Sequence, residues 1–252
     1  MTATTTPVLA TTKERILNTA ERLFAERGYS ATSLRAIIAA ADVNLASVHY
    51  HFDSKESLLE AVILRRAIPA NEERLRLLEL CEREAGDGPL DATKVIEAFV
   101  LPAFLAAKDP ARGGPVYRRL VGRLYAEGDL MPRLTAKHFV PLLARFANAL
   151  ARSLPDLPQV ELYWRVHFAM GSVAMALRGT GDWEAFDGGL QEPRDTEMLL
   201  RRLVGFLDAG FRAPVVEAPM SKDAPKREDL PKREDPPMSQ DLPMSIAAGK
   251  ES

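Results

Sequence analysis

The sequence predicts an all-α protein in which an N-terminal three-helix unit with a helix-turn-helix precedes a larger helical domain. Between residues 32 and 55, two short segments with helical apolar spacing flank a tight turn, and a third begins directly after them. Beyond this point apolar residues recur three and four positions apart to about residue 211, with Gly- and Pro-rich loops between the segments. We therefore expect four parts: a disordered arm (1–10), a helix-turn-helix domain (11–57), a larger helical domain (58–212) and a disordered tail (213–252).

The first helix is expected to begin near Thr11 or Thr12. Thr11 and Glu14 have the spacing of a capping box, and Gly28 fits the C′ position, directly after the last turn of a helix. Between these signals one face of the helix is apolar, formed by Ile16, Leu17, Ala20, Leu23 and Phe24.

Three helix starts define the helix-turn-helix. Thr32 is the expected N-cap of a helix over 33–40, and Asn44 the expected N-cap of a second helix that ends near His51. Ser54 caps the next helix and places Lys55 in its first turn. In such a layout the second helix enters the major groove of DNA.

The outward side chains of this second helix are small or able to form hydrogen bonds, which suits a surface that approaches DNA closely. The candidates for contacts with base edges are Arg35, Asn44, Leu45, Ala46, Ser47 and His49. The candidates for contacts with phosphates are Thr32, Ser33, Tyr50, His51 and Lys55, because phosphate contacts position a domain while base contacts specify the sequence. Two alternatives stay open: the three helices only pack together, and His51 is a half-buried brace.

The segment from about residue 12 to residue 60 resembles the DNA-binding domain of the tetracycline-repressor (TetR) family of bacterial transcription regulators. The residues that carry the resemblance are Ala20, Leu23, Phe24, Gly28, Tyr29, Thr32, Ser33, Leu34, Ile37, Ala40, Val43, Val48, Tyr50, His51, Phe52, Lys55, Leu58 and Leu59. One residue departs from the family pattern: His49 stands where many members have a tyrosine that contacts phosphate. The wording of residues 44–52 looks closest to a subgroup that includes fatty-acid-responsive regulators.

The larger domain is expected to be a series of helices. A helix that starts at Lys55 is interrupted at Pro69, because proline removes a backbone donor and clashes with the preceding turn. The further helical segments cover residues 70–84, 91–107, 116–127, 132–153, 160–178 and 193–211.

The segment 160–178 is apolar almost all round, so it needs cover on more than one side. Together with 193–211 it is the expected interface of a homodimer, and the family resemblance implies a four-helix bundle from two protomers. The alternative is a central helix in a monomeric core.

The larger domain is also expected to hold a ligand pocket, because it is rich in apolar side chains and poor in clustered polar groups. The candidate lining residues are Phe99, Phe104, Tyr125, Phe139, Phe146, Trp164, Phe168 and Met175, each of which could equally belong to the core. Such a pocket suits a small hydrophobic effector, and the subgroup resemblance implies an acyl chain or acyl thioester. Six basic residues could pair with an effector anion, and nothing in the sequence singles one out: Arg118, Arg119, Arg123, His138, Arg165 and His167.

Composition narrows the function classes. A formal charge of −2 and a pI near 6.1 argue against a protein that coats nucleic acid through bulk charge. Cys81 is the only cysteine, so no internal disulfide forms, and two histidines two positions apart on one helix, His49 and His51, do not make a metal pair. Neither a Gly-rich phosphate loop nor a nucleophile-elbow motif indicates an enzyme, and we expect no cofactor.

The expected protein is therefore a cytoplasmic transcription regulator. The sequence shows neither the pattern of a signal peptide nor an apolar run long enough to span a membrane. Its expected partners are a palindromic double-stranded DNA operator, a second copy of the chain and a small effector that releases a repressor from that operator. The main alternative is an all-helical binding or scaffold protein whose helix-turn-helix is only structural, and an all-α enzyme is a weaker third reading.

Overall fold

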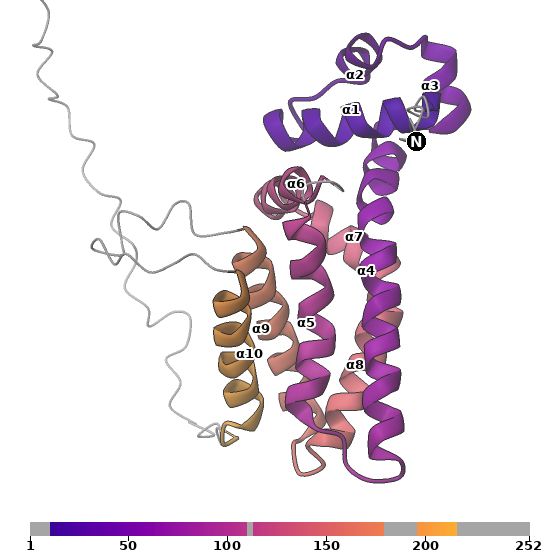
Figure 1. The fold of residues 1–252 in the computed structure, drawn as a ribbon. Coiled ribbons are helices and arrows are strands. Elements are labelled where there is room, and N and C mark those ends of the chain that lie inside the picture. The colour runs from indigo at the N-terminus through magenta and orange to yellow at the C-terminus, as the bar shows by residue number, and fades with distance from the viewer. Residues whose placement is uncertain (1–10, 110–112, 179–195, 216–252) are drawn as a thin grey trace, which may run out of the picture. The chain divides into compact units, whose positions relative to one another are not determined.

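The computed structural model describes residues 11–109, 113–178 and 196–215 (Figure 1). The predicted arm 1–10, the expected helix start at Pro193 and all but the first residues of the predicted tail lie outside these ranges. The described residues form ten α-helices and no strand: α1 (Thr12–Arg27), α2 (Leu34–Ala41), α3 (Leu45–His51), α4 (Lys55–Ala85), α5 (Ala92–Lys108), α6 (Gly114–Ala126), α7 (Leu130–His138), α8 (Val140–Ser153), α9 (Gln159–Arg178) and α10 (Thr196–Arg212). The prediction of an all-α fold is confirmed.

Side-chain caps fix the starts of the first four helices. Thr11 accepts a hydrogen bond from the backbone N–H of Glu14, whose carboxylate accepts from the Thr11 N–H in return. Asn44 and Ser54 cap α3 and α4 as predicted.

The predicted cap of α2 is wrong by one residue. Ser33, not Thr32, accepts a hydrogen bond from the backbone N–H of Ala36 at 3.1 Å. The hydroxyl of Thr32 is buried and donates to the Gly28 carbonyl at 2.7 Å, so it fastens the end of α1 instead.

The predicted break at Pro69 is also wrong, because α4 runs through it without interruption. Pro69 lies on the exposed side of α4, where water can replace the hydrogen bond that proline omits. The opposite face of α4 is buried before the proline, at Ile63 and Ala67, and after it, at Leu78. Because buried residues lie both before and after Pro69 in the sequence, packing holds the two halves of α4 in one helix.

The single helix predicted for 132–153 is two helices, α7 and α8, which meet at Phe139. Pro141 explains the break, since its ring opposes the carbonyl one turn earlier and restricts the residue before it. Figure 1 shows α7 beside the upper part of α4 and α8 running down behind α4.

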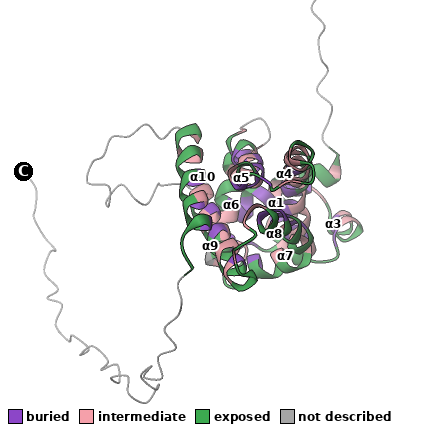
Figure 2. Cartoon of the chain, turned by 90° about the horizontal axis from the view of Figure 1, so that it is seen from below, coloured by how far each residue is buried: buried purple, intermediate pink, exposed green. Residues whose placement is uncertain are grey.

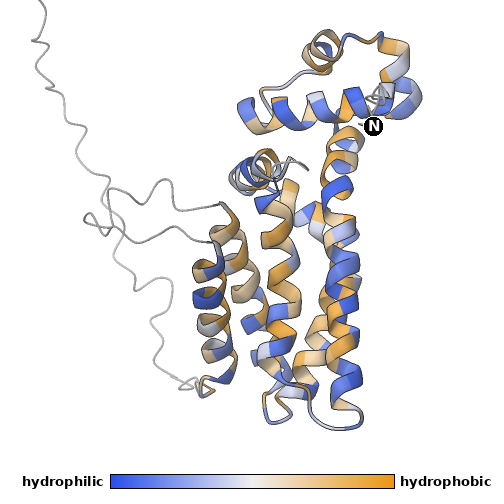
Figure 3. Ribbon diagram, in the orientation of Figure 1, coloured by the Kyte–Doolittle hydropathy of each residue, from blue (hydrophilic) through white to orange (hydrophobic). Residues whose placement is uncertain are grey.

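Two apolar clusters form the core. One unites the inner faces of α1–α3 and the start of α4 with Leu120 and Leu124 of α6 and Leu134 of α7. The other lies among α4, α5, α8, α9 and α10, where Figure 3 shows α5 as largely apolar. The helix-turn-helix therefore shares its core with two helices of the larger domain.

Candidate DNA-binding surface and effector pocket

Helix α3 is anchored by one buried side and presents the other to solvent. Val48 is fully buried and Phe52 nearly so, whereas Tyr50 is 85% exposed and Leu45 55% exposed. Of the other predicted contacts, Ser33, Arg35, Asn44, Ala46 and His49 are exposed, and Ser47, His51 and Lys55 are partly buried. The exposed face of α3 thus carries small or uncharged polar and aromatic side chains and no acidic, lysine or arginine side chain.

Asn44 shapes the start of this face. Its side-chain oxygen accepts from the backbone N–H of Ser47 at 2.7 Å and from the Ser47 hydroxyl at 2.8 Å. Both bonds use the oxygen, so the amide nitrogen of Asn44 keeps its two donors for a partner. The ring of His51 lies against Tyr50, with centroids 4.9 Å apart, which restrains both side chains.

Two predicted phosphate contacts have other roles in the structure. Thr32 is 1% exposed, so its hydroxyl cannot reach DNA. The ammonium of Lys55 donates to the carbonyls of Tyr29 at 2.9 Å and Thr32 at 3.0 Å, and lies 4.1 Å from the centroid of the Tyr29 ring. Lys55 therefore holds the loop between α1 and α2 and keeps at most one N–H for a phosphate.

The turn between α2 and α3 depends on Arg15, which sequence analysis did not identify. Asp42 ends α2 in a left-handed conformation with φ of 51°. Arg15 of α1 donates to the carbonyl of Ala41 at 2.7 Å and also to the carbonyl of Asp42. A guanidinium thus satisfies the carbonyls left free at the end of α2 and ties the turn to α1.

A carboxylate from the larger domain reaches the loop between α1 and α2. Glu127, directly after α6, accepts from the backbone N–H groups of Tyr29 at 3.0 Å and Ser30 at 2.9 Å. Gly28 makes room for it, since a Cβ there would lie 2.3 Å from the carboxylate, and its φ of 90° also favours glycine. No local sequence signal could have linked Glu127 to residues almost a hundred positions earlier.

A buried ion pair joins α1 to α4. Glu21 is 2% exposed, and its carboxylate accepts from Arg65 and from both Nε and Nη2 of Arg66 at 2.9 Å. Arg65 also donates to Asn18 at 2.7 Å. Two guanidinium groups compensate one carboxylate that folding removes from water.

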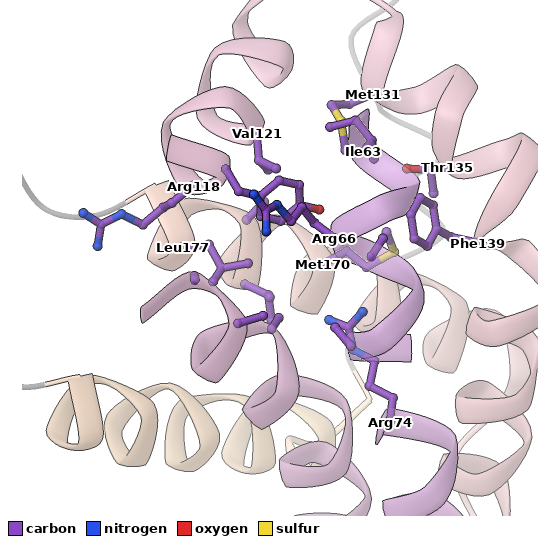
Figure 4. Close-up of a pocket in the computed structure, with 18 of the residues that line it drawn as sticks. Ile63, Arg66, Arg74, Arg118, Val121, Met131, Thr135, Phe139, Met170 and Leu177 are labelled. Atoms are coloured by element: carbon purple, nitrogen blue, oxygen red, sulfur yellow. The ribbon is translucent and has the colours of Figure 1, made fainter. Parts of the chain in front are cut away.

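The larger domain contains a cavity of about 130 Å³ that is partly open to solvent. A pocket of about 800 Å³ adjoins it, and Tyr125, Thr135, Leu143 and Met170 line both. Helices α4–α9 all contribute to the lining of the cavity of about 130 Å³, which is mainly apolar (Figure 4). Arg66 and Arg74 line it from α4, and Tyr117 and Tyr125 from α6. Burial raises the pKa of Tyr117 to about 12, so its hydroxyl stays protonated at neutral pH.

The structure places the eight predicted lining residues in different surroundings. Phe99, Tyr125 and Phe139 line this cavity, and Phe146 lines a neighbouring one of about 30 Å³. Phe104 is a buried core residue that lines neither cavity. The prediction is wrong for Trp164, Phe168 and Met175, because α9 turns these side chains outward, where they are 48–63% exposed.

Of the six basic residues that could pair with an effector anion, Arg118 lines this cavity and His167 lines the adjoining pocket. Arg118 lies beside the cavity, but Figure 4 shows its side chain pointing away from the other lining residues. Arg165 is occupied by Glu161 and by the Phe211 carbonyl, which accepts at 2.8 Å. Arg74, which sequence analysis did not consider, lines the cavity directly. Its position in a charged stretch of α4 gave no signal of burial.

Within the described ranges, His, Cys, Asp and Glu side chains form no group of three that could hold a metal ion. In the same residues, no helix combines the length and apolar character needed to cross a lipid bilayer.

Comparison with known proteins identifies the family. The family model described as "Bacterial regulatory proteins, tetR family" matches residues 16–62, and the one described as "Tetracyclin repressor-like, C-terminal domain" matches residues 97–210. The chain belongs to the TetR family. The two matched ranges cover the helix-turn-helix with the start of α4, and α5 through most of α10.

Relatives of this TetR-family chain extend the comparison. It is 39% identical over 54 residues to the transcriptional regulator UidR of Escherichia coli K12 and 44% identical over 48 residues to the negative transcriptional regulator IcaR of Staphylococcus aureus. These alignments cover 21% and 19% of this chain, and only 28% of UidR and 26% of IcaR, so they concern the DNA-binding domain alone.

A solved structure extends the likeness in fold to the larger domain. The fatty acid degradation regulator FadR of Bacillus halodurans superposes with a TM-score of 0.51 at 15% identity, over 82% of this chain and the whole of that one. The larger domain of this TetR-family chain therefore has the expected helical architecture, and identity at this level carries the fold alone.

Proposed function

We propose that this chain is a homodimeric, sequence-specific DNA-binding regulator, a repressor that leaves a palindromic operator when a small effector occupies the cavity. The outward face of α3 is the observation that carries this proposal. A helix that only meets water would be expected to carry charged, bulky side chains, whereas this one exposes Asn44, Leu45, Ala46, His49 and Tyr50. Amide and imidazole groups can exchange hydrogen bonds with base edges, and small side chains let the helix enter the groove.

Exposed apolar side chains support a homodimer through α9 and α10, where Figure 2 shows many exposed positions. Tyr163, Trp164 and Phe168 of α9 are 48–65% exposed, and Phe206 of α10 is 67% exposed. The rings of Trp164 and Phe168 stack with centroids 6.0 Å apart, which makes one continuous apolar surface. Such a surface is typical of a protein interface, and a two-fold axis would let the same surface serve both protomers.

The cavity is physically connected to the DNA-binding helices, which supports regulation by an effector. Ile63, Tyr117 and Met131 line the cavity and also belong to, or pack against, the apolar cluster of α1–α3. Arg66 lines the cavity while its guanidinium is paired with Glu21 of α1. An occupant that shifts these side chains would favour protein conformations whose two recognition helices no longer match successive major grooves.

Selection of bound duplexes from a random DNA pool tests the proposal, with the full chain at near-physiological salt. We expect enrichment of a palindrome, whose half-site spacing would report the distance between the two α3 helices. Folded, dimeric protein that enriches no sequence would contradict the proposal and favour a scaffold role.

A matched pair of variants tests the assigned face. Tyr50→Ala removes an exposed ring on α3 and should weaken operator binding about tenfold without lowering thermal stability. Arg76→Ala is the control that should bind as wild type does, because Arg76 is exposed on α4 and its one partner among the described residues is Glu73. Equal operator affinity for both variants would show that the DNA-binding face is elsewhere.

A further inference from the structure

Arg74 is a charged side chain that lines an apolar cavity without a carboxylate to balance it. It lies on α4, and Figure 4 shows its guanidinium pointing toward Met170 and the other lining side chains. Burial lowers the pKa of Arg74 to about 10, so the group is still protonated at neutral pH. Burying the protonated guanidinium costs solvation free energy, and no carboxylate among the described residues offsets that cost.

The contacts of Arg74 leave part of its guanidinium free. Its Nε donates to the carbonyl of Phe99 at 2.7 Å, and Nη1 donates to the side-chain oxygen of Asn71 at 2.8 Å. The Phe99 ring covers the guanidinium, 4.6 Å from its centroid. Guanidinium carries five N–H donors, so three remain, and none of them has an acceptor among the described residues. These contacts hold the guanidinium in one orientation in the absence of a ligand.

The other cations at the cavity cannot take the same role. Arg66 is already paired with the buried carboxylate of Glu21 at 2.9 Å. Arg118 is exposed and points away from the cavity, so water screens its charge. Among the described residues that line the cavity, Arg74 therefore carries the one uncompensated positive charge, which matches one negative charge on a ligand.

The size and the walls of the cavity indicate which part of that ligand lies next to Arg74. At about 130 Å³ it is close to an apolar cavity of about 150 Å³ that accommodates benzene. Phe99, Phe139, Val173 and Leu177 provide apolar walls. A body about the size of one six-membered ring fills this volume, and a longer chain would extend into the adjoining pocket of about 800 Å³.

We propose that the cavity binds an apolar monocarboxylate, with its carboxylate on the free N–H donors of Arg74 and its ring or chain against Phe99 and Phe139. The proposal deepens the regulatory function proposed above and rests on it for the biological role of the ligand. Two parallel N–H···O bonds from a guanidinium fix both the charge and the orientation of a carboxylate.

Calorimetric titration of the full chain at pH 7.5 tests the site directly. Benzoate, cyclohexanecarboxylate and octanoate are each compared with their primary amides, which keep the shape but lack the charge. We expect at least one of these acids to bind at least tenfold more tightly than its amide. Arg74→Met should weaken binding of these acids about 10- to 100-fold and leave the amides unchanged, with Arg74→Lys between the two. Arg76→Met, on the solvent side of the same helix, is the matched control and should bind as wild type does.

Three results would overturn the inference: equal affinity for acids and amides, undiminished acid binding by folded Arg74→Met, or binding of none of the three acids. Adding the bound acid to the complex with operator DNA separates this inference from the proposed function. Acid binding without an operator, or without release from it, contradicts the proposed function and leaves the site standing. Operator binding by protein that ignores all three acids contradicts the site alone.

Discussion

Replacing Glu21 with glutamine should destabilise the protein more than any exposed charge change on the same helix. The substitution keeps the volume of the side chain but removes the negative charge that compensates Arg65 and Arg66. The carboxylate is almost fully buried, whereas the two arginine side chains are 24% and 22% exposed and can regain some hydration. The loss is therefore expected near the lower end of the range for a broken buried ion pair, about 3 kcal/mol.

A loss of about 3 kcal/mol corresponds to a fall in Tm of about 6–12 °C for a domain of this size. Differential scanning calorimetry at one fixed protein concentration measures it, because the Tm of a dimer depends on concentration. Glu26→Gln is the matched control on α1, since Glu26 forms only an exposed pair with Arg22. Its expected effect is below about 0.5 kcal/mol. Equal falls in Tm for the two variants would refute the argument that burial makes the Glu21 pair important.

Three further predictions follow from contacts described above. Lys55→Ala removes the donor to the carbonyls of Tyr29 and Thr32, so the free energy of unfolding should fall by about 1–2 kcal/mol in denaturant titration; an unchanged midpoint would mean that Lys55 is free. Phe168→Asp places a charge on the exposed apolar surface of α9 and should yield monomers in sedimentation at micromolar concentration, whereas persistent dimers would place the interface elsewhere. Burial raises the pKa of the Cys81 thiol above its ordinary value of 9.0, so fewer thiolates exist at any lower pH and alkylation by iodoacetamide should still accelerate above pH 9; a rate that levels off below pH 9 would contradict this.

The helix-turn-helix was predictable because its signals are local. The caps at Thr11, Asn44 and Ser54 depend on side chains that bond backbone groups three residues away. The predicted cap at Thr32 failed because two adjacent residues, Thr32 and Ser33, are both good caps, and the contact with Gly28 that separates their roles is tertiary. Packing likewise decided that α4 continues through Pro69, against the local preference of proline.

The cavity was harder to predict than the DNA-binding face, since lining a cavity is a tertiary property. Phe99 and Phe168 are indistinguishable as sequence letters, yet one faces the cavity and the other is exposed on α9. Arg74 and Arg76 both lie in a charged stretch of α4, and two positions on a helix are enough to turn one inward and the other outward. Hydrophobic periodicity finds apolar faces, and it cannot find a charged residue that folding encloses.

Helix α6 has consequences for how new ligand preferences can arise in this protein. Leu120 and Leu124 belong to the cluster that supports the DNA-binding helices, while Val121, on the adjoining face, lines the cavity. Tyr117 does both. Substitutions on α6 that reshape the cavity therefore also change the support of the DNA-binding helices, and selection would often reject them. Val173 and Leu177 on α9 line the cavity without touching that cluster, so ligand preference has most freedom to diverge there.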